Sequence, residues 1–245
     1  MRIISTVTRD DGVTETHFSH DDIPGVLWSP AGATGPCPLV LIGHGGGQHK
    51  KAPGVVGHAL RFVTGYGFAA ASIDAPHHGD RVPSPEFEAM VAGIRRKVAA
   101  GEPIGPHMGG LNERLATEAV PEWQSVLGAL LALELPGGPV GYYGVSMGGG
   151  LGIPFVAAEP RIAAAVFGLA ASDSLMEVAG QVTVPVQYLM QWDDQMVPRD
   201  AALALFDAFG SPEKTLHANP GGHGDVPRFE VDETAAFFAR HLGAL

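Results

Sequence analysis

The chain has 245 residues, of which 45% are hydrophobic, and its formal net charge at pH 7 is −11. This length and apolar content suit one α/β domain with a large core. The acidic balance disfavours nucleic acid and anionic membrane surfaces as partners. The single cysteine, Cys37, cannot form an internal disulfide, and its place before an apolar segment favours a small buried side chain.

No apolar stretch reaches the roughly 20 residues that a transmembrane helix needs. The N-terminus also lacks the apolar run of a signal peptide. We therefore expect a cytoplasmic protein with no membrane partner. A homodimer is left open as its oligomeric state.

The first part of the chain is predicted to be rich in β-structure. Three short strands are expected over residues 3–8, 14–19 and 25–28. Residues 38–43 are apolar on both faces, which is typical of a central parallel strand. This strand leads directly into His44-Gly45-Gly46-Gly47.

Strand and helix patterns then alternate to the end of the chain. Strands are predicted over 68–74, 140–145, 162–170, 184–191 and 215–218, and helices over 54–66, 118–135, 200–209 and 229–242. This alternation predicts a mostly parallel sheet with helices on both faces. Without a repeat or linker, residues 1–245 are predicted to form a single domain.

Residues 76–117 interrupt this alternation with a connection far longer than usual. Within it, Phe87, Met90, Val91, Ile94 and Val98 recur at helical spacing, and Arg95, Arg96 and Lys97 fall on the opposite face. A glycine- and proline-rich run follows, from residue 101 to 110. The segment is interpreted either as a surface excursion or as a small helical cap over a substrate site.

Ser146 lies in the pattern Gly144-Val-Ser-Met-Gly148, between an apolar strand and a segment able to form a helix. Such a corner holds a hydroxyl above the sheet, next to the amides of a helix N-terminus. The pattern alone also fits an ordinary glycine-rich turn with an incidental serine. The strand and helix on either side favour a nucleophile.

A serine nucleophile needs a base and a group that orients the base. His223 is the candidate base, because it follows the last predicted strand in a glycine-rich loop. Asp193 and Asp194 follow the preceding strand, and Asp173 follows the one before that. Adjacent extended residues point in opposite directions, so only one of Asp193 and Asp194 is expected to face the histidine.

An oxyanion hole is expected from backbone amides that point at the developing negative charge. Gly46 in the His44-Gly-Gly-Gly run and Met147 after the serine are the predicted donors. A flexible turn is the alternative interpretation of the glycine run.

Together these motifs resemble the α/β-hydrolase superfamily, and within it small dienelactone-hydrolase-like and esterase-like members. The resemblance rests on His44-Gly-Gly-Gly, Gly144-Val-Ser-Met-Gly148, Asp194-Gln-Met-Val-Pro198 and Gly222-His223-Gly224. It implies a mostly parallel eight-stranded sheet and the triad Ser146, Asp194 and His223, since the family's acid stands in Asp-x-x-Val-Pro. It also implies that the segment from Asp74 to Arg81 borders the site. Dienelactone hydrolases use cysteine as nucleophile, so the serine here favours general esters over lactones.

The substrate is expected to contact His44, Gly45, Trp192, Met196 and Met90. Two histidine groups, His77-His78 with Asp80 and His44 with His49, lack a metal-site spacing with a third ligand, so no metal is expected. No Gly-Lys-Ser/Thr follows a glycine run, so a phosphate-binding loop is not expected and no cofactor is predicted.

The predicted function is a serine hydrolase that cleaves a small or medium carboxylic ester through an acyl-enzyme. A thioesterase, an amidase or a carbon–carbon hydrolase would use the same triad. Alternatives outside catalysis are a hydrolase-like ligand-binding protein and an interaction module built around residues 76–117.

Overall fold

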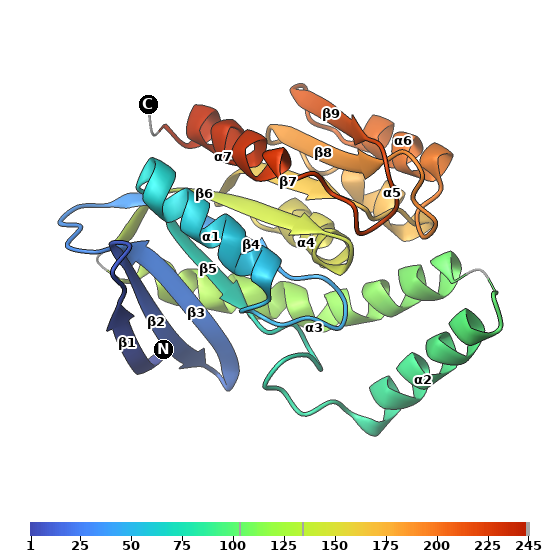
Figure 1. The fold of residues 1–245 in the computed structure, drawn as a ribbon, viewed down its shortest axis with the longest axis horizontal. Helices are drawn as coiled ribbons and strands as arrows, with labels where there is room; N and C mark the ends of the chain where they lie inside the picture. The colour runs from blue at the N-terminus through green and yellow to red at the C-terminus, as the bar shows by residue number, and fades with distance from the viewer. Residues whose placement is uncertain (103, 134, 244–245) are drawn as a thin grey trace.

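The computed structural model describes residues 1–102, 104–133 and 135–243, and Figure 1 shows how their helices surround one twisted sheet. Within these residues the sheet has nine strands in the order β1-β2-β3-β5-β4-β6-β7-β8-β9. The strands are β1 (Arg2–Thr8), β2 (Val13–His20), β3 (Ile23–Pro30), β4 (Cys37–Gly43), β5 (Ala69–Ile73), β6 (Pro136–Val145), β7 (Ile162–Gly168), β8 (Val186–Gln191) and β9 (Lys214–Asn219). The helices are α1 (Pro53–Tyr66), α2 (Pro85–Ala99), α3 (Gly105–Leu131), α4 (Met147–Ala158), α5 (Asp173–Ala179), α6 (Arg199–Ala208) and α7 (Phe229–Leu242).

The sheet changes from antiparallel to parallel along its width. Strands β1, β2, β3 and β5 pair antiparallel in turn, and every later pairing, from β5–β4 to β8–β9, is parallel. The described sheet thus has one strand more than the eight that the family resemblance implied. We identify β1, at the outer edge of the sheet, as the additional strand. Every residue of β1 is exposed, and the strand is held by its pairing with β2.

Helices cover both faces of the parallel part, as the alternating pattern predicted. One face packs against α1 and α7 through aromatic side chains such as Phe62 and Phe238. The other face packs against α3, α4, α5 and α6 around Trp123, Tyr142 and Phe155. Both cores are closely filled with fully buried side chains, so the strand ends that carry the site are held rigidly. Cys37 is a buried free cysteine at the start of β4.

The insertion differs from its prediction in two respects. The helix at α2 lies within the predicted stretch, and Figure 1 shows it beside the first turns of α3, away from the sheet. However, α3 begins at Gly105, so it includes most of the glycine- and proline-rich run and starts well before the helix predicted over residues 118–135. Packing explains this outcome, because Leu111, Leu115 and Ala119 on α3 form an apolar cluster with Phe87 on α2. Tertiary burial of this kind outweighs the low helix propensity of glycine.

The apolar stripe on α2 is also shorter than predicted. Phe87 is buried, and Met90, Val91 and Ile94 are partly buried against the same cluster, but Val98 is 56% exposed. The stripe therefore ends one turn before the end of the helix. Among the helices of the described residues, none combines the length and the hydropathy needed to cross a membrane.

Candidate active site

Ser146 occupies a sharp corner between β6 and α4. Its backbone has φ 56° and ψ −124°, and residues other than glycine rarely adopt a positive φ of this kind. The corner is tight because Gly144 and Gly148 lie against other main chain. A Cβ at Gly144 would stand 2.3 Å from the carbonyl oxygen of Gly148, and one at Gly148 would stand 2.5 Å from that of Gly43. Only glycine fits at these two flanks, which explains the Gly-x-Ser-x-Gly pattern physically.

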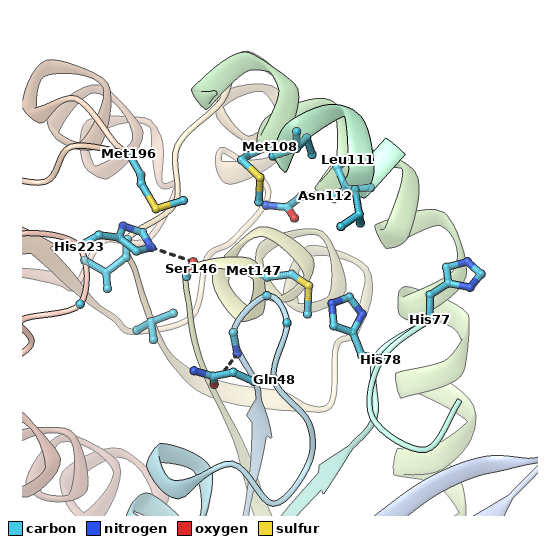
Figure 2. Close-up of a pocket in the computed structure, with 18 of the residues that line it drawn as sticks. Gln48, His77, His78, Met108, Leu111, Asn112, Ser146, Met147, Met196 and His223 are labelled. Carbon is cyan, nitrogen blue, oxygen red and sulfur yellow. Dashed lines mark hydrogen bonds between the residues drawn. The ribbon is translucent and has the colours of Figure 1, made fainter. Parts of the chain in front are cut away.

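Three side chains from different segments meet at this corner. His223 Nε2 lies 2.9 Å from Ser146 Oγ, as Figure 2 shows. His223 Nδ1 lies 2.7 Å from Asp194 Oδ2. A carboxylate oxygen can only accept, so Nδ1 carries a proton, and Nε2 of the neutral ring is free to accept from the hydroxyl. The side chains of Asp194 and His223 are only 2% and 15% exposed, which keeps this chain of contacts largely away from water.

Asp194 is oriented from its other side by the backbone. Its Oδ1 accepts hydrogen bonds from Met196 N at 2.7 Å and Val197 N at 2.9 Å, which leaves Oδ2 for the imidazole. Asp193 points outward instead, with a side chain that is 67% exposed and 4.0 Å from Arg199. Asp173 starts α5 and makes no contact with His223. The structure thus brings Asp194, not the other two candidates, next to the histidine.

The loop after β4 is held by His44. Its Nδ1 lies 2.8 Å from the carbonyl oxygen of Gly45, and its Nε2 accepts the N–H of Ala75 at 3.0 Å. Because a carbonyl only accepts and an amide only donates, the ring must be neutral with its proton on Nδ1. Burial lowers the pKa of His44 to about 4, in agreement with a neutral ring.

Fixing the carbonyl group of Gly45 also fixes the direction of the Gly46 N–H. The oxygen of Gly45 and the N–H of Gly46 belong to one planar peptide group and point in opposite directions. Gln48 N donates to the same oxygen at 3.2 Å, so two donors fix this peptide plane. A Cβ placed on Gly46 would lie 3.8 Å from Met147 Cβ, so the two residues predicted to supply the oxyanion donors are neighbours in space.

A cavity of about 720 Å³ opens in front of Ser146. Its walls come from the loop after β4, the segment after β5, the insertion helices and the loops that carry Met196 and His223. Apolar side chains make up much of the wall: Phe87, Val91, Ile94, Met108, Leu111, Met147, Leu169 and Val226. The insertion therefore does form one wall of the candidate site.

The residues expected to contact substrate are placed differently from one another. Gly45 and Met196 line the cavity. Trp192 does not, because it is 45% exposed and stacks under Arg199, whose guanidinium carbon is 3.8 Å from the ring centroid. Met90 lies on α2 beside a separate small depression, and His44 is buried behind the loop. These three side chains do not line the cavity, and the sequence could not show this because it does not tell which way a side chain points.

The segment from Asp74 to Arg81 contains an ion-pair network that the sequence did not reveal. Asp74 is fully buried and accepts from Lys50 N, Lys50 Nζ and Asp80 N at 2.9, 2.6 and 2.9 Å. Lys50 Nζ also lies 2.6 Å from Asp80, and Arg81 makes two bonds of 2.6 and 2.7 Å to Glu122 on α3. This network fixes the segment that carries His77 and His78 into the cavity wall. In the part of the chain that the structure describes, no group of three or more His, Cys, Asp or Glu residues could hold a metal ion.

Comparisons with known proteins place this architecture in a family. No protein-family model and no curated protein matches the chain. Among solved structures, a PEG-bound cold-adapted esterase from an Arctic intertidal metagenomic library is 34% identical, with a TM-score of 0.78 over 98% of this chain and 100% of that one.

Two more distant structures share the fold. An acetyl xylan esterase from Paenibacillus sp. R4 is 15% identical, with a TM-score of 0.70 over 98% of this chain and 88% of that one. An S-formylglutathione hydrolase from Agrobacterium tumefaciens is 17% identical, with a TM-score of 0.69 over 99% of this chain and 100% of that one. With this sheet, and with a relative so similar over its whole length, the chain belongs to the α/β-hydrolase superfamily, among its esterase-like members.

Proposed function

We propose that this protein is a serine esterase that cleaves small or medium carboxylic esters through an acyl-enzyme. Ser146 is the nucleophile, His223 the general base and acid, and Asp194 the group that orients and stabilises the imidazolium. The observation that carries the proposal is the continuous line of hydrogen bonds from Asp194 through His223 to Ser146, at 2.7 and 2.9 Å. These are the contacts that convert a weakly nucleophilic hydroxyl into a reactive one.

In the first half-reaction, Ser146 Oγ forms a bond to the ester carbonyl carbon while its proton moves to His223 Nε2. The carbonyl oxygen becomes an oxyanion that accepts from the amides of Gly46 and Met147. The tetrahedral intermediate then collapses, the bond from carbon to the alcohol oxygen breaks, and His223 gives its proton to the departing alcohol. The acyl group remains on Ser146.

In the second half-reaction, water attacks the acyl carbon and His223 accepts the proton of the water. Collapse of the second intermediate breaks the bond to Ser146 Oγ, which takes the proton back from His223. The carboxylic acid leaves and the enzyme is restored. Asp194 keeps its charge throughout, and its two backbone donors keep Oδ2 aimed at Nδ1.

The size and surface of the cavity support a neutral ester of modest size. A volume of about 720 Å³ falls within the range of roughly 300–1,000 Å³ that is usual for small-molecule sites. The apolar side chains from α2 and α3 favour an uncharged group next to the scissile bond. The esterase relative of 34% identity makes ester hydrolysis the preferred reaction among those that share a triad.

Hydrolysis of p-nitrophenyl acetate and p-nitrophenyl butyrate tests the proposal, with Ser146→Ala as the matched variant. The wild-type protein should release nitrophenol with saturation kinetics, and Ser146→Ala should lose at least about 10³-fold in kcat. Equal rates for the two proteins would exclude Ser146 as the nucleophile.

A further inference from the structure

His78 presents an unused hydrogen-bond acceptor in the cavity wall. Its Nδ1 lies 2.8 Å from the carbonyl oxygen of Pro76, so Nδ1 carries the proton and Nε2 of the neutral ring is an acceptor. Burial lowers the pKa of His78, which keeps the ring neutral. In the described part of the chain Nε2 has no hydrogen-bond partner, although the residue is only 9% exposed and lines the cavity.

Asn112 on α3 provides a second polar group without a partner. Its amide makes no hydrogen bond with any other described residue. Its Oδ1 is sealed from solvent without a donor, so Nδ2 is the atom of this amide that can reach a substrate group. The side chain packs over Gly150 and lines the cavity together with Met108 and Leu111. Figure 2 shows Asn112 and His78 on either side of Met147, both reaching into the cavity from different elements.

Buried polar groups in folded proteins are almost always hydrogen-bonded, so the unpartnered amide of Asn112 calls for an explanation. His78 Nε2 is open to the same cavity and has no protein partner among the described residues. Phe87, Met108 and Leu111 beside them present only apolar surface, whereas Gln48, His77 and Arg95 add polar groups elsewhere in the wall. His78 and Asn112 are both uncharged, so a neutral hydrogen-bonding group can pair with them. A hydroxyl group can donate to a histidine nitrogen and accept from an amide N–H, so one hydroxyl suits both His78 Nε2 and Asn112 Nδ2.

We infer that His78 and Asn112 form a hydrogen-bonding subsite for free hydroxyl groups of the substrate, so that the preferred esters are hydroxylated ones. This inference rests on the proposed esterase function and adds the class of ester. Two sources of the hydroxyl share this chemistry: a hydroxylated acyl chain and a partly esterified polyol. A site built to hydrogen-bond a hydroxyl discriminates strongly against the analogue that lacks it, because its polar groups are then left unpaired.

Two matched substrate pairs separate these sources. The first pair, p-nitrophenyl 3-hydroxybutyrate and p-nitrophenyl butyrate, differs in the acyl chain. The second pair, glycerol 1-monobutyrate and propyl butyrate, differs in the alcohol. For each pair the measured quantity is the ratio of kcat/KM for the hydroxylated ester to that for its partner. The wild-type ratio should exceed about tenfold in at least one pair.

Two substitutions test whether the ratio depends on the subsite. His78→Asn keeps an N–H donor in reach of Pro76 but removes the acceptor at Nε2, and Asn112→Leu replaces the amide by an apolar group of similar size. Each variant should reduce the elevated ratio at least severalfold. Two controls lie on α3 outside the cavity: His107→Asn repeats the histidine exchange, and Gln124→Leu replaces a related amide. Both should keep the wild-type ratio. Thermal melts of all four variants identify any that fail to fold, and either subsite variant alone suffices for the test.

The outcomes are distinct. Hydrolysis without a preference in either pair, or a preference that both subsite variants retain, would overturn the subsite while leaving the esterase proposal intact. No hydrolysis of any of the four esters would overturn the esterase proposal, and the subsite with it.

Discussion

His44 donates a hydrogen bond from Nδ1 to the carbonyl oxygen of Gly45 across 2.8 Å. That carbonyl is one side of the peptide group whose other side is the Gly46 N–H, the proposed oxyanion donor. The ring is itself fixed by the N–H of Ala75, which donates to Nε2. A buried imidazole outside the cavity therefore sets the direction of the amide that is proposed to bind the oxyanion.

This arrangement predicts opposite effects for two substitutions. His44→Asn places an amide N–H near the position of Nδ1, so it keeps the bond to Gly45 and should keep kcat within about threefold. His44→Gln reaches instead to the position of Nε2, so it leaves Gln48 N as the one remaining donor to the Gly45 carbonyl and loosens the peptide. The expected loss in kcat is about 10–100-fold, with little change in KM, because losing an oxyanion donor outright costs about 10²–10³-fold.

The test is a steady-state comparison of the two variants with p-nitrophenyl butyrate, accompanied by urea unfolding. His44→Asn should be the less stable of the two, by about 1–3 kcal/mol, because it leaves the buried N–H of Ala75 without an acceptor. Equal kcat values for the two variants would contradict the positioning role.

His44 also makes the stability of the fold depend on pH. Its pKa in the folded state is about 4, below the usual 6.5, because it is buried. Between these two values the unfolded chain binds the proton more readily, so stability should fall as the pH is lowered from 6.5 towards 4. The part due to His44 should be on the order of 2–3 kcal/mol at pH 4.5.

Urea unfolding at pH 7.0 and pH 4.5 measures this contribution. The pKa values of His58 and His78 are also lowered by burial, so the wild-type protein should lose more than the share of His44 alone. In His44→Asn the loss between the two pH values should shrink by about that share. An identical loss in variant and wild type would show that His44 does not titrate as expected.

The two adjacent aspartates should differ sharply on substitution. Asp194→Asn disturbs the carboxylate that holds the Nδ1 proton of His223, so kcat should fall by about 10⁴-fold. Asp193→Asn changes an exposed side chain that faces Arg199 at 4.0 Å, so kcat should stay within about twofold. Comparable losses in the two variants would mean that the acid is wrongly assigned.

The glycines of the chain should respond to alanine according to their surroundings. At Gly148 the new Cβ would stand 2.5 Å from the carbonyl oxygen of Gly43, so the main chain must move, at a cost of about 1–3 kcal/mol or more. At Gly57, within α1, a Cβ meets nothing within 4 Å. Gly57→Ala should therefore stabilise the protein by up to about 1 kcal/mol. Chemical denaturation of both variants provides the measurement, and a Gly148→Ala protein as stable as wild type would contradict the packing described for the corner.

Much of the fold could be predicted because the parallel strands are recognisable from their apolar sequences. The segment at β4 is apolar on both faces, and the helices at α1 and α7 carry a clear helical period. The start of α3 could not be predicted, since a run with several glycines has low helix propensity, and only its burial against α2 makes it helical. Propensity is local information, whereas this helix is stabilised by distant residues.

The candidate site shows the same division. Ser146, Asp194 and His223 could be proposed from their order and from their position after strands, and the structure brings them together. The placements of Trp192 and His44 could not, because they depend on which neighbour each side chain contacts. His78 and Asn112 were missed for a related reason. They stand out because their polar atoms lack hydrogen-bond partners within the protein, and a single sequence cannot show this.

The central claim is that Ser146 is a nucleophile activated by His223. A fluorophosphonate probe tests it most directly, because only an activated hydroxyl attacks the phosphorus and keeps the adduct. We predict one adduct per chain, located by mass spectrometry on the peptide that contains Ser146 and absent from both Ser146→Ala and His223→Ala. A wild-type protein that hydrolyses esters but takes up no probe, or takes it up at another residue, would contradict the account.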